Sequence, residues 1–83
     1  MSNSMKFKYD YKDYDEDISE AIKRVEESFF DYKNNPNIKM KYLNLKDSIY
    51  DLHLVLKEKV IEGVISSVKA EDMKNYYWGL LLK

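Results

Sequence analysis

The sequence lacks cysteine and is poor in glycine and proline, and these shortages exclude several classes of functional site. With no cysteine among 83 residues, disulfides and thiolate metal sites are excluded, and the composition fits a reducing compartment. The two glycines, Gly63 and Gly79, stand apart from each other, so no glycine-rich phosphate-binding loop can form. We therefore expect no nucleotide-binding loop of the usual kind and no cofactor.

Long apolar runs and a surplus of one charge are also missing. No stretch of 18 apolar residues is present, and no apolar core follows the N-terminal lysines as in a signal peptide. With 14 basic and 15 acidic side chains and a net charge of −1, the chain does not resemble a protein that coats DNA. These absences predict a cytoplasmic protein with no membrane partner.

The length predicts one small domain spanning residues 1–83. Such a chain buries roughly 60–65% of its unfolded surface, which is enough for one modest core. Small domains often gain further stability from disulfides, metals or association. Because cysteine is absent, we expect association between copies of the chain.

The first part of the chain alternates apolar and polar residues, which is the period of a half-buried strand. Met5, Phe7, Tyr9 and Tyr11 are separated by lysine and aspartate, and an acidic run follows. We expect residues 1–16 to form an extended acidic and aromatic arm, with a β-strand as the alternative. A lone strand needs a partner, so the arm predicts contact with another chain.

A helix is predicted over about residues 17–34. Asp17 and Glu20 have the spacing of a capping box. Apolar residues then recur at spacings of four and three, which places one stripe on one side of the helix. This stripe comprises Ile18, Ile22, Val25, Phe29 and Tyr32.

A second, longer helix is predicted over about residues 36–63, with Asn35 as its cap, Pro36 at its first position and Gly63 near its end. The short connection predicts an antiparallel hairpin. One apolar stripe holds Ile38, Leu45, Ile49, Leu52, Leu56 and Val60. A second stripe, about 140° round the helix at 100° per residue, holds Leu43, Tyr50, Leu54 and Ile61. Two apolar stripes predict two neighbours, of which the first helix can cover only one.

The C-terminal part of the chain is strongly apolar, and its pattern fits either a helix or a strand. Met73, Tyr77 and Leu80 have helical spacing, which favours a third helix over about residues 67–82 with Ser66 or Ser67 as its cap. The aromatic content of residues 76–82 supports a strand paired with residues 5–11 as the alternative. The predicted fold is mainly α: an antiparallel helical hairpin, a C-terminal third helix and an extended N-terminal arm.

Catalytic and metal-binding patterns are weak. His53, the single histidine, has no nucleophile or second histidine at a recognisable spacing. Asp13, Asp15 and Asp17 alternate like the first ligands of a calcium loop, but Ile18 and Arg24 occupy positions where that loop needs glycine and an acid. We therefore expect neither an enzyme nor a metal site.

The combination of an unpaired arm, an acidic tyrosine run and a surplus apolar stripe predicts a non-enzymatic protein–protein interaction module. The arm would add a strand to a partner's sheet edge, or its acids would meet a basic surface. Abundant lysine, asparagine, isoleucine and tyrosine suggest an AT-rich genome, so a phage- or virus-like regulator or inhibitor acting as a homo-oligomer in the host cytoplasm is expected. The predicted interface residues are Phe7, Tyr9, Tyr11, Asp13, Tyr14, Leu43, Leu54, Ile61, Tyr77 and Trp78.

The alternative function is binding of nucleic acid or of a small anionic nucleotide. On the second predicted helix, three lysines fall on one side together with two flat side chains, and such a row can contact phosphates and stack on bases. These residues are Lys39, Lys46, Tyr50, His53 and Lys57. Lysine stems that flank an apolar stripe and reach into water would give the same pattern.

Overall fold

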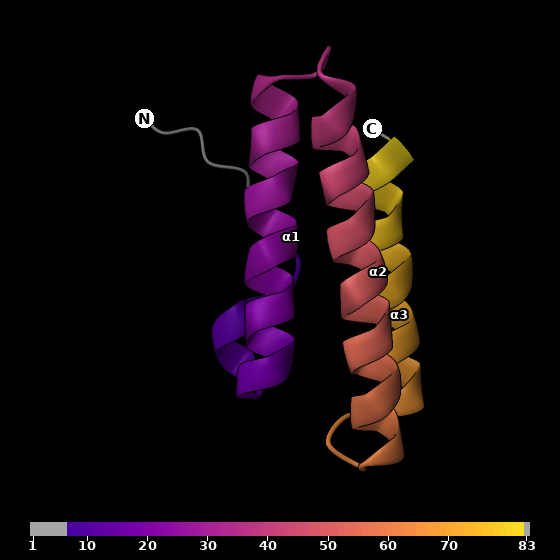
Figure 1. Cartoon of the computed structure of the whole chain (residues 1–83). Helices are drawn as coiled ribbons and strands as arrows, with labels where there is room; N and C mark the ends of the chain where they lie inside the picture. Colours follow the sequence, from indigo (N-terminus) through magenta and orange to yellow (C-terminus); the bar gives the residue numbers. More distant parts are fainter. Residues whose placement is uncertain (1–6, 83) are drawn as a thin grey trace.

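Three helices make up most of the computed structural model, which describes residues 7–82 (Figure 1). Helix α1 (Glu16–Asn34) and helix α2 (Lys39–Ile61) form an antiparallel hairpin, and helix α3 (Ser67–Gly79) runs back along α2. Two short 3-10 turns, η1 (Tyr11–Asp13) and η2 (Leu80–Leu82), flank them. The mainly α prediction is confirmed. The strand alternative for residues 76–82 is wrong, because α3 and η2 occupy them.

Helix α1 begins one residue earlier than expected, because Asp15 and not Asp17 caps it. The Asp15 carboxylate accepts a hydrogen bond from the Ile18 backbone N–H at 3.0 Å. This bond, with Lys59 nearby, holds the pKa of Asp15 below its ordinary value. Asp17 instead lies 2.9 Å from the Lys59 ammonium. Both acids suit the positive end of the helix dipole, so sequence alone does not separate their roles.

The hairpin turn differs from its prediction in the role of Asn35. The Asn35 amide donates to the backbone carbonyl of Asp31 at 3.0 Å, so it closes α1 rather than capping α2. Pro36 and Asn37 form a turn, Ile38 precedes the helix without a side-chain cap, and α2 begins at Lys39. The predicted start at residue 36 is therefore wrong, since the only capping side chain is used by the preceding helix.

The end of α2 shows why Gly63 is needed. The Gly63 N–H donates to the carbonyl of Val60 at 3.0 Å, and the Val64 N–H donates to that of Lys59 at 2.9 Å. This pair of bonds requires a left-handed residue between them, and Gly63 has φ 81°. Ser66 then caps α3 by accepting from the Lys69 N–H at 3.1 Å. The predicted helix stop and the Ser66 cap are confirmed, with α2 ending at Ile61.

The core lies between the three helices and uses the predicted α1 stripe and the first α2 stripe. From α2, Leu45, Ile49, Leu52 and Leu56 are fully buried. Ile38 is exposed because it stands before the helix begins. The buried core residues of the other helices are Ile18, Ala21, Ile22, Val25, Phe29, Ala70, Met73, Tyr77 and Leu80.

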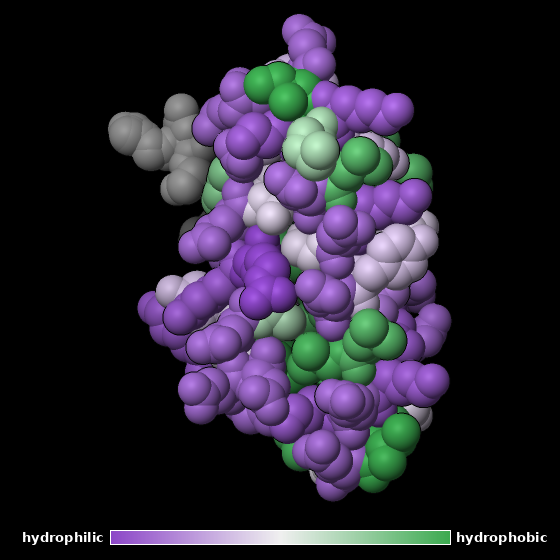
Figure 2. All heavy atoms as spheres, viewed as in Figure 1, coloured by the Kyte–Doolittle hydropathy of each residue, from purple (hydrophilic) through white to green (hydrophobic). Residues whose placement is uncertain are grey.

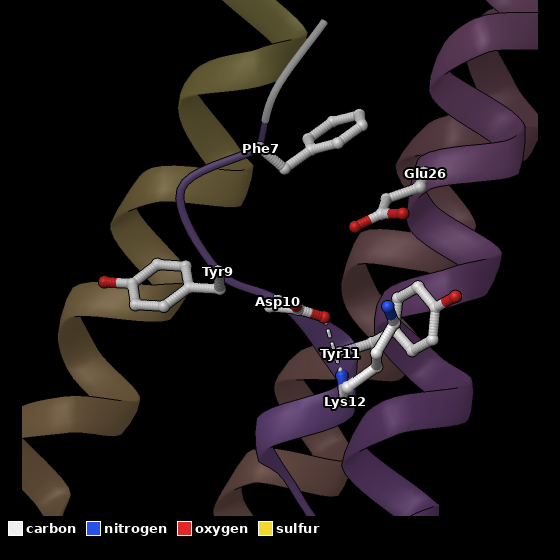
Figure 3. A pocket seen from close by; sticks show the side chains of 6 residues that line it. All are labelled: Phe7, Tyr9, Asp10, Tyr11, Lys12 and Glu26. Atoms are coloured by element: carbon white, nitrogen blue, oxygen red, sulfur yellow. Dashed lines mark hydrogen bonds between the residues drawn. The ribbon is translucent and has the colours of Figure 1, made fainter. Parts of the chain in front are cut away.

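Residues 7–14, here called the N-terminal segment, lie between α1 and α3 (Figure 3). The Tyr9 ring is only 6% exposed and meets the Tyr76 ring edge-on at 5.5 Å. The Phe7 ring meets Phe29 of α1 at 5.7 Å. This segment contains η1 and no strand, so a free extended arm is wrong for residues 7–14. The apolar side chains of the alternating run cover the molecule's own core, while Met5 lies outside the described residues.

Candidate functional site

The second apolar stripe of α2 remains uncovered in the folded chain. Its exposed fractions are 37% for Leu43, 48% for Tyr50, 62% for Leu54 and 76% for Ile61. Helix α1 packs on one flank of α2 and α3 on another, and among residues 7–82 α3 reaches this side through Trp78, which lies next to Tyr50. Figure 2 shows the result as separate apolar patches along the line of α2, divided by polar side chains. The predicted surplus of apolar surface is thus present among residues 7–82.

Two charged residues complete this row. Asp47 and Lys57 are exposed, and neither forms an ion pair within 4.0 Å among residues 7–82. The row then advances by alternating steps of four and three residues, which is the heptad spacing of a helix that packs along another helix. We call this set the α2 row: Leu43, Asp47, Tyr50, Leu54, Lys57 and Ile61.

A second feature joins α2 to α3. The Trp78 ring lies 5.4 Å from the Tyr50 ring and 5.9 Å from the His53 ring, measured between centroids. Burial lowers the pKa of His53 below its ordinary value, and the nearby Lys74 charge lowers it further. His53 is therefore a neutral packing residue at pH 7. We call Tyr50, His53 and Trp78 the aromatic cluster.

Lysines surround the aromatic cluster. Lys46 and Lys57 lie one helical turn from Tyr50 and His53, respectively, on the same side of α2. Lys57 is exposed and Lys46 is half-buried. Lys39 is exposed at the first position of α2, further from the cluster. Sequence reasoning missed Lys74, although its position four residues before Trp78 on the third predicted helix is the signal that would have found it.

Several predicted interface residues outside α2 are buried or half-buried in the folded chain. Tyr9 and Tyr77 are in the core, and Phe7, Tyr11 and Tyr14 are half-buried against it. Asp13 is exposed in η1. The Lys8 N–H donates to the Tyr76 hydroxyl at 3.0 Å. Adding a strand to a partner's sheet would require this segment to leave the groove between α1 and α3.

An open hollow of about 430 Å³ lies beside the N-terminal segment. Its walls include Phe7, Asp10 and Glu26, and the Glu26 carboxylate points into it from α1 (Figure 3). Burial raises the pKa of Glu26, and the Asp10 charge raises it further. Tyr9, Tyr11 and Lys12 complete the lining of the hollow.

Metal sites and membrane-spanning helices are both absent from residues 7–82. Within that range, no three histidine, aspartate or glutamate side chains come together as a metal site. None of the described helices is both long enough and apolar enough to cross a bilayer. The α2 row and the aromatic cluster share Tyr50, so these two surface features adjoin each other.

Comparison with known proteins gives little guidance. No family model matches the chain, and no solved structure matches it. A stretch of 65 residues, 78% of this chain, is 31% identical to a nonribosomal peptide synthetase, kk1B, of Curvularia clavata. That stretch makes up 0% of the synthetase's length after rounding, so the chain spans a negligible part of this relative. The likeness assigns neither a family nor an activity to this chain.

Proposed function

We propose that this protein is a non-enzymatic interaction module that binds another polypeptide through the α2 row. The observation that carries this proposal is the exposure of Leu43, Tyr50, Leu54 and Ile61 along one side of α2, although the core has been filled. An apolar row of this kind, edged by charges, is typical of a protein-binding helix.

Burial of this row against a partner would contribute favourable free energy to association. Burying a leucine or isoleucine side chain completely contributes roughly 1.5–3 kcal/mol. Leu54 and Ile61 keep most of their surface in water, so each would contribute the larger part of that amount. Tyr50 adds a ring of the type that dominates interface energies.

In this proposal the protein is a small regulator or inhibitor of viral type. It acts as a homo-oligomer in the cytoplasm of its host. The balanced charge and the cysteine-free composition support a cytoplasmic place. The exposed row supports action by occupying a surface rather than by chemistry.

Site-specific photo-crosslinking in expressing cells tests the proposal. A photoreactive residue replaces Leu54 in the α2 row, and a control replaces exposed Glu27 on α1. We expect a covalent adduct with a polypeptide at position 54 and none at position 27, with the adduct lost when Leu43→Lys is added. Absence of an adduct at position 54, or equal adducts at both positions, would contradict the proposal.

The aromatic cluster favours a second candidate, which is binding of single-stranded nucleic acid or a nucleotide. Helix α3 brings Trp78 to Tyr50 and His53, which adds a third ring to the two aromatic side chains that α2 offers alone. Lys46, Lys57 and Lys74 surround it with positive charge. Stacking on aromatic rings and phosphate contacts are the two elements of such binding.

The single tryptophan makes this candidate simple to test. Binding of a single-stranded oligonucleotide or of a mononucleotide should quench Trp78 emission at low salt, and added salt should weaken that binding steeply. Lys74→Ala should weaken it as well, whereas Lys12→Ala in the N-terminal segment should not. Unchanged emission at low salt with both titrants would remove this candidate.

A further inference from the structure

The α2 row contains two charges of opposite sign, and a second copy of the row can pair each of them with an opposite charge. Its heptad steps run without a break from Leu43 to Ile61, a rise of about 27 Å along the helix. Asp47 and Lys57 stand five residues each from the level of Leu52, a core residue on the opposite side of α2 that marks the midpoint of the row. This symmetry of the row about its own centre points to a particular partner.

We propose that the partner of the α2 row is a second copy of this chain, bound antiparallel about a two-fold axis level with Leu52. This inference rests on the proposed function, because it names the polypeptide that the α2 row binds. Reversal about that axis places Leu43 against Ile61 of the second copy and Tyr50 against Leu54. It also places Asp47 against Lys57, and the axis repeats each of these pairs.

The alternative, parallel pairing brings each residue against its own copy. Asp47 would then meet Asp47, and Lys57 would meet Lys57, inside an apolar seam. Like charges directly opposite each other cost free energy, and more so where water is excluded. Only the antiparallel arrangement turns the two interruptions of the row into two pairs of opposite charge. The charges thereby select the orientation, as polar residues in a helical seam commonly do.

The flanks of the row are compatible with this arrangement. Asp51 lies beside the row and would approach its own copy near the axis. Arg24 of α1 is 3.2 Å from the Asp51 carboxylate within the same chain, so each Asp51 charge is already compensated. On the other flank lies the aromatic cluster, which adds apolar surface next to Tyr50. The α2 face is therefore bordered by one compensated acid and one aromatic group.

Charge exchange tests the pairing directly. The wild-type chain should have twice the mass of one chain by light scattering at high concentration. Asp47→Lys alone or Lys57→Asp alone creates two like-charge pairs, so each should raise the dimer Kd by about tenfold or more. Mixing the two single variants pairs lysine with aspartate at both places, and dimers should return. Both positions are exposed, so helix content by circular dichroism should stay unchanged.

Cysteine pairing gives a second readout, because the chain has no cysteine of its own. A mixture of Leu43→Cys and Ile61→Cys chains should form mixed disulfides on oxidation, and Leu43→Cys alone should not. Self-crosslinking of Leu43→Cys alone would show parallel pairing and overturn the inference. A monomeric wild type would overturn it too, as would dimers indifferent to both charge changes. The photo-adduct at position 54 could then still be another protein, so failure here is distinct from failure of the proposed function.

Discussion

At the scale of single residues, two buried side-chain atoms, the Tyr77 hydroxyl and His53 Nε2, have no hydrogen-bond partner among residues 7–82, and the first lies in the core. Burial, together with the Glu26 charge, raises the pKa of Tyr77 above its ordinary value. A buried hydroxyl without a partner costs about 1–3 kcal/mol.

Removal of this hydroxyl should therefore stabilise the protein. We expect Tyr77→Phe to raise the free energy of unfolding by about 1 kcal/mol, since the ring packing is kept. Tyr76→Phe is the matched control, because it removes the acceptor of the Lys8 N–H and should lower stability by about 0.5 kcal/mol. Urea unfolding measures both. A loss of stability in Tyr77→Phe would show that the hydroxyl has a partner.

Glu26 makes stability depend on pH in the opposite direction from most carboxylates. Its pKa in the folded chain lies above the ordinary value of 4.5, mainly because of burial. The folded state thus holds the proton more tightly than the unfolded chain does. The resulting stabilisation is present below pH 4.5 and is lost as the pH rises through the folded pKa.

Replacement of the Glu26 carboxyl by an uncharged amide should prevent the loss of stability at neutral pH. We expect Glu26→Gln to be more stable than wild type at pH 7, with a smaller gain near pH 4.5, by thermal unfolding at the two values. Glu27→Gln, a change to the exposed neighbour on α1, should match wild type at both. Equal stability of Glu26→Gln and wild type at pH 7 would contradict the role of burial at this site.

At the scale of elements, the start of α1 depends on one side chain. Asp15 both accepts from the Ile18 N–H and lies 3.2 Å from the Lys59 ammonium. Asp15→Ala should cost about 1 kcal/mol, the usual effect of losing a cap. Asp15→Asn keeps the cap and loses only the charge, so it should cost less. Chemical denaturation separates the two, and a larger loss in Asp15→Asn would contradict the assignment of the cap.

The N-terminal segment behaves as an element, although it is not one regular helix. Tyr9 carries its contact with α3, through ring centroids 5.5 Å from Tyr76 and 6.0 Å from Tyr77. Tyr9→Ala should destabilise the fold by about 3 kcal/mol, a typical cost of removing a buried aromatic ring. Tyr9→Phe keeps the ring and should remain close to wild type. If Tyr9→Ala unfolds at the same urea concentration as wild type, this segment does not cover the core.

At the scale of the whole molecule, periodicity predicted the three helices and both α2 stripes, since apolar spacing reports directly on which sides are covered. The capping-box spacing predicts Asp17 as the cap of α1, whereas Asp15 is the cap, because both acids suit the start of a helix. Sequence patterns also placed Tyr9 and Tyr77 on a surface. The alternation of apolar and polar residues in the N-terminal segment indicates that one side of the segment is buried. It does not indicate that α1 and α3 are the helices that bury it. The sequence predicts Trp78 at an interface, whereas its contact with the Tyr50 and His53 rings depends on how α3 returns along α2.

Lys59 of α2 connects the start of α1 with the turn that leads to α3. Its ammonium lies near Asp17 and Asp15 at the start of α1 and near Glu62 after α2, and its carbonyl accepts from the Val64 N–H on the way to α3. Hydrogen bonds to these acids, Asp17 first, raise its pKa above the ordinary value. With only 12% of the side chain exposed, this amine should be the slowest of the lysines to be acylated by an amine-reactive ester, as peptide mass spectrometry would measure. The rate of Lys59 acylation would then report how often the helices separate enough to expose this amine. Equally fast acylation of Lys59 and exposed Lys57 would show that the Lys59 ammonium is accessible in solution.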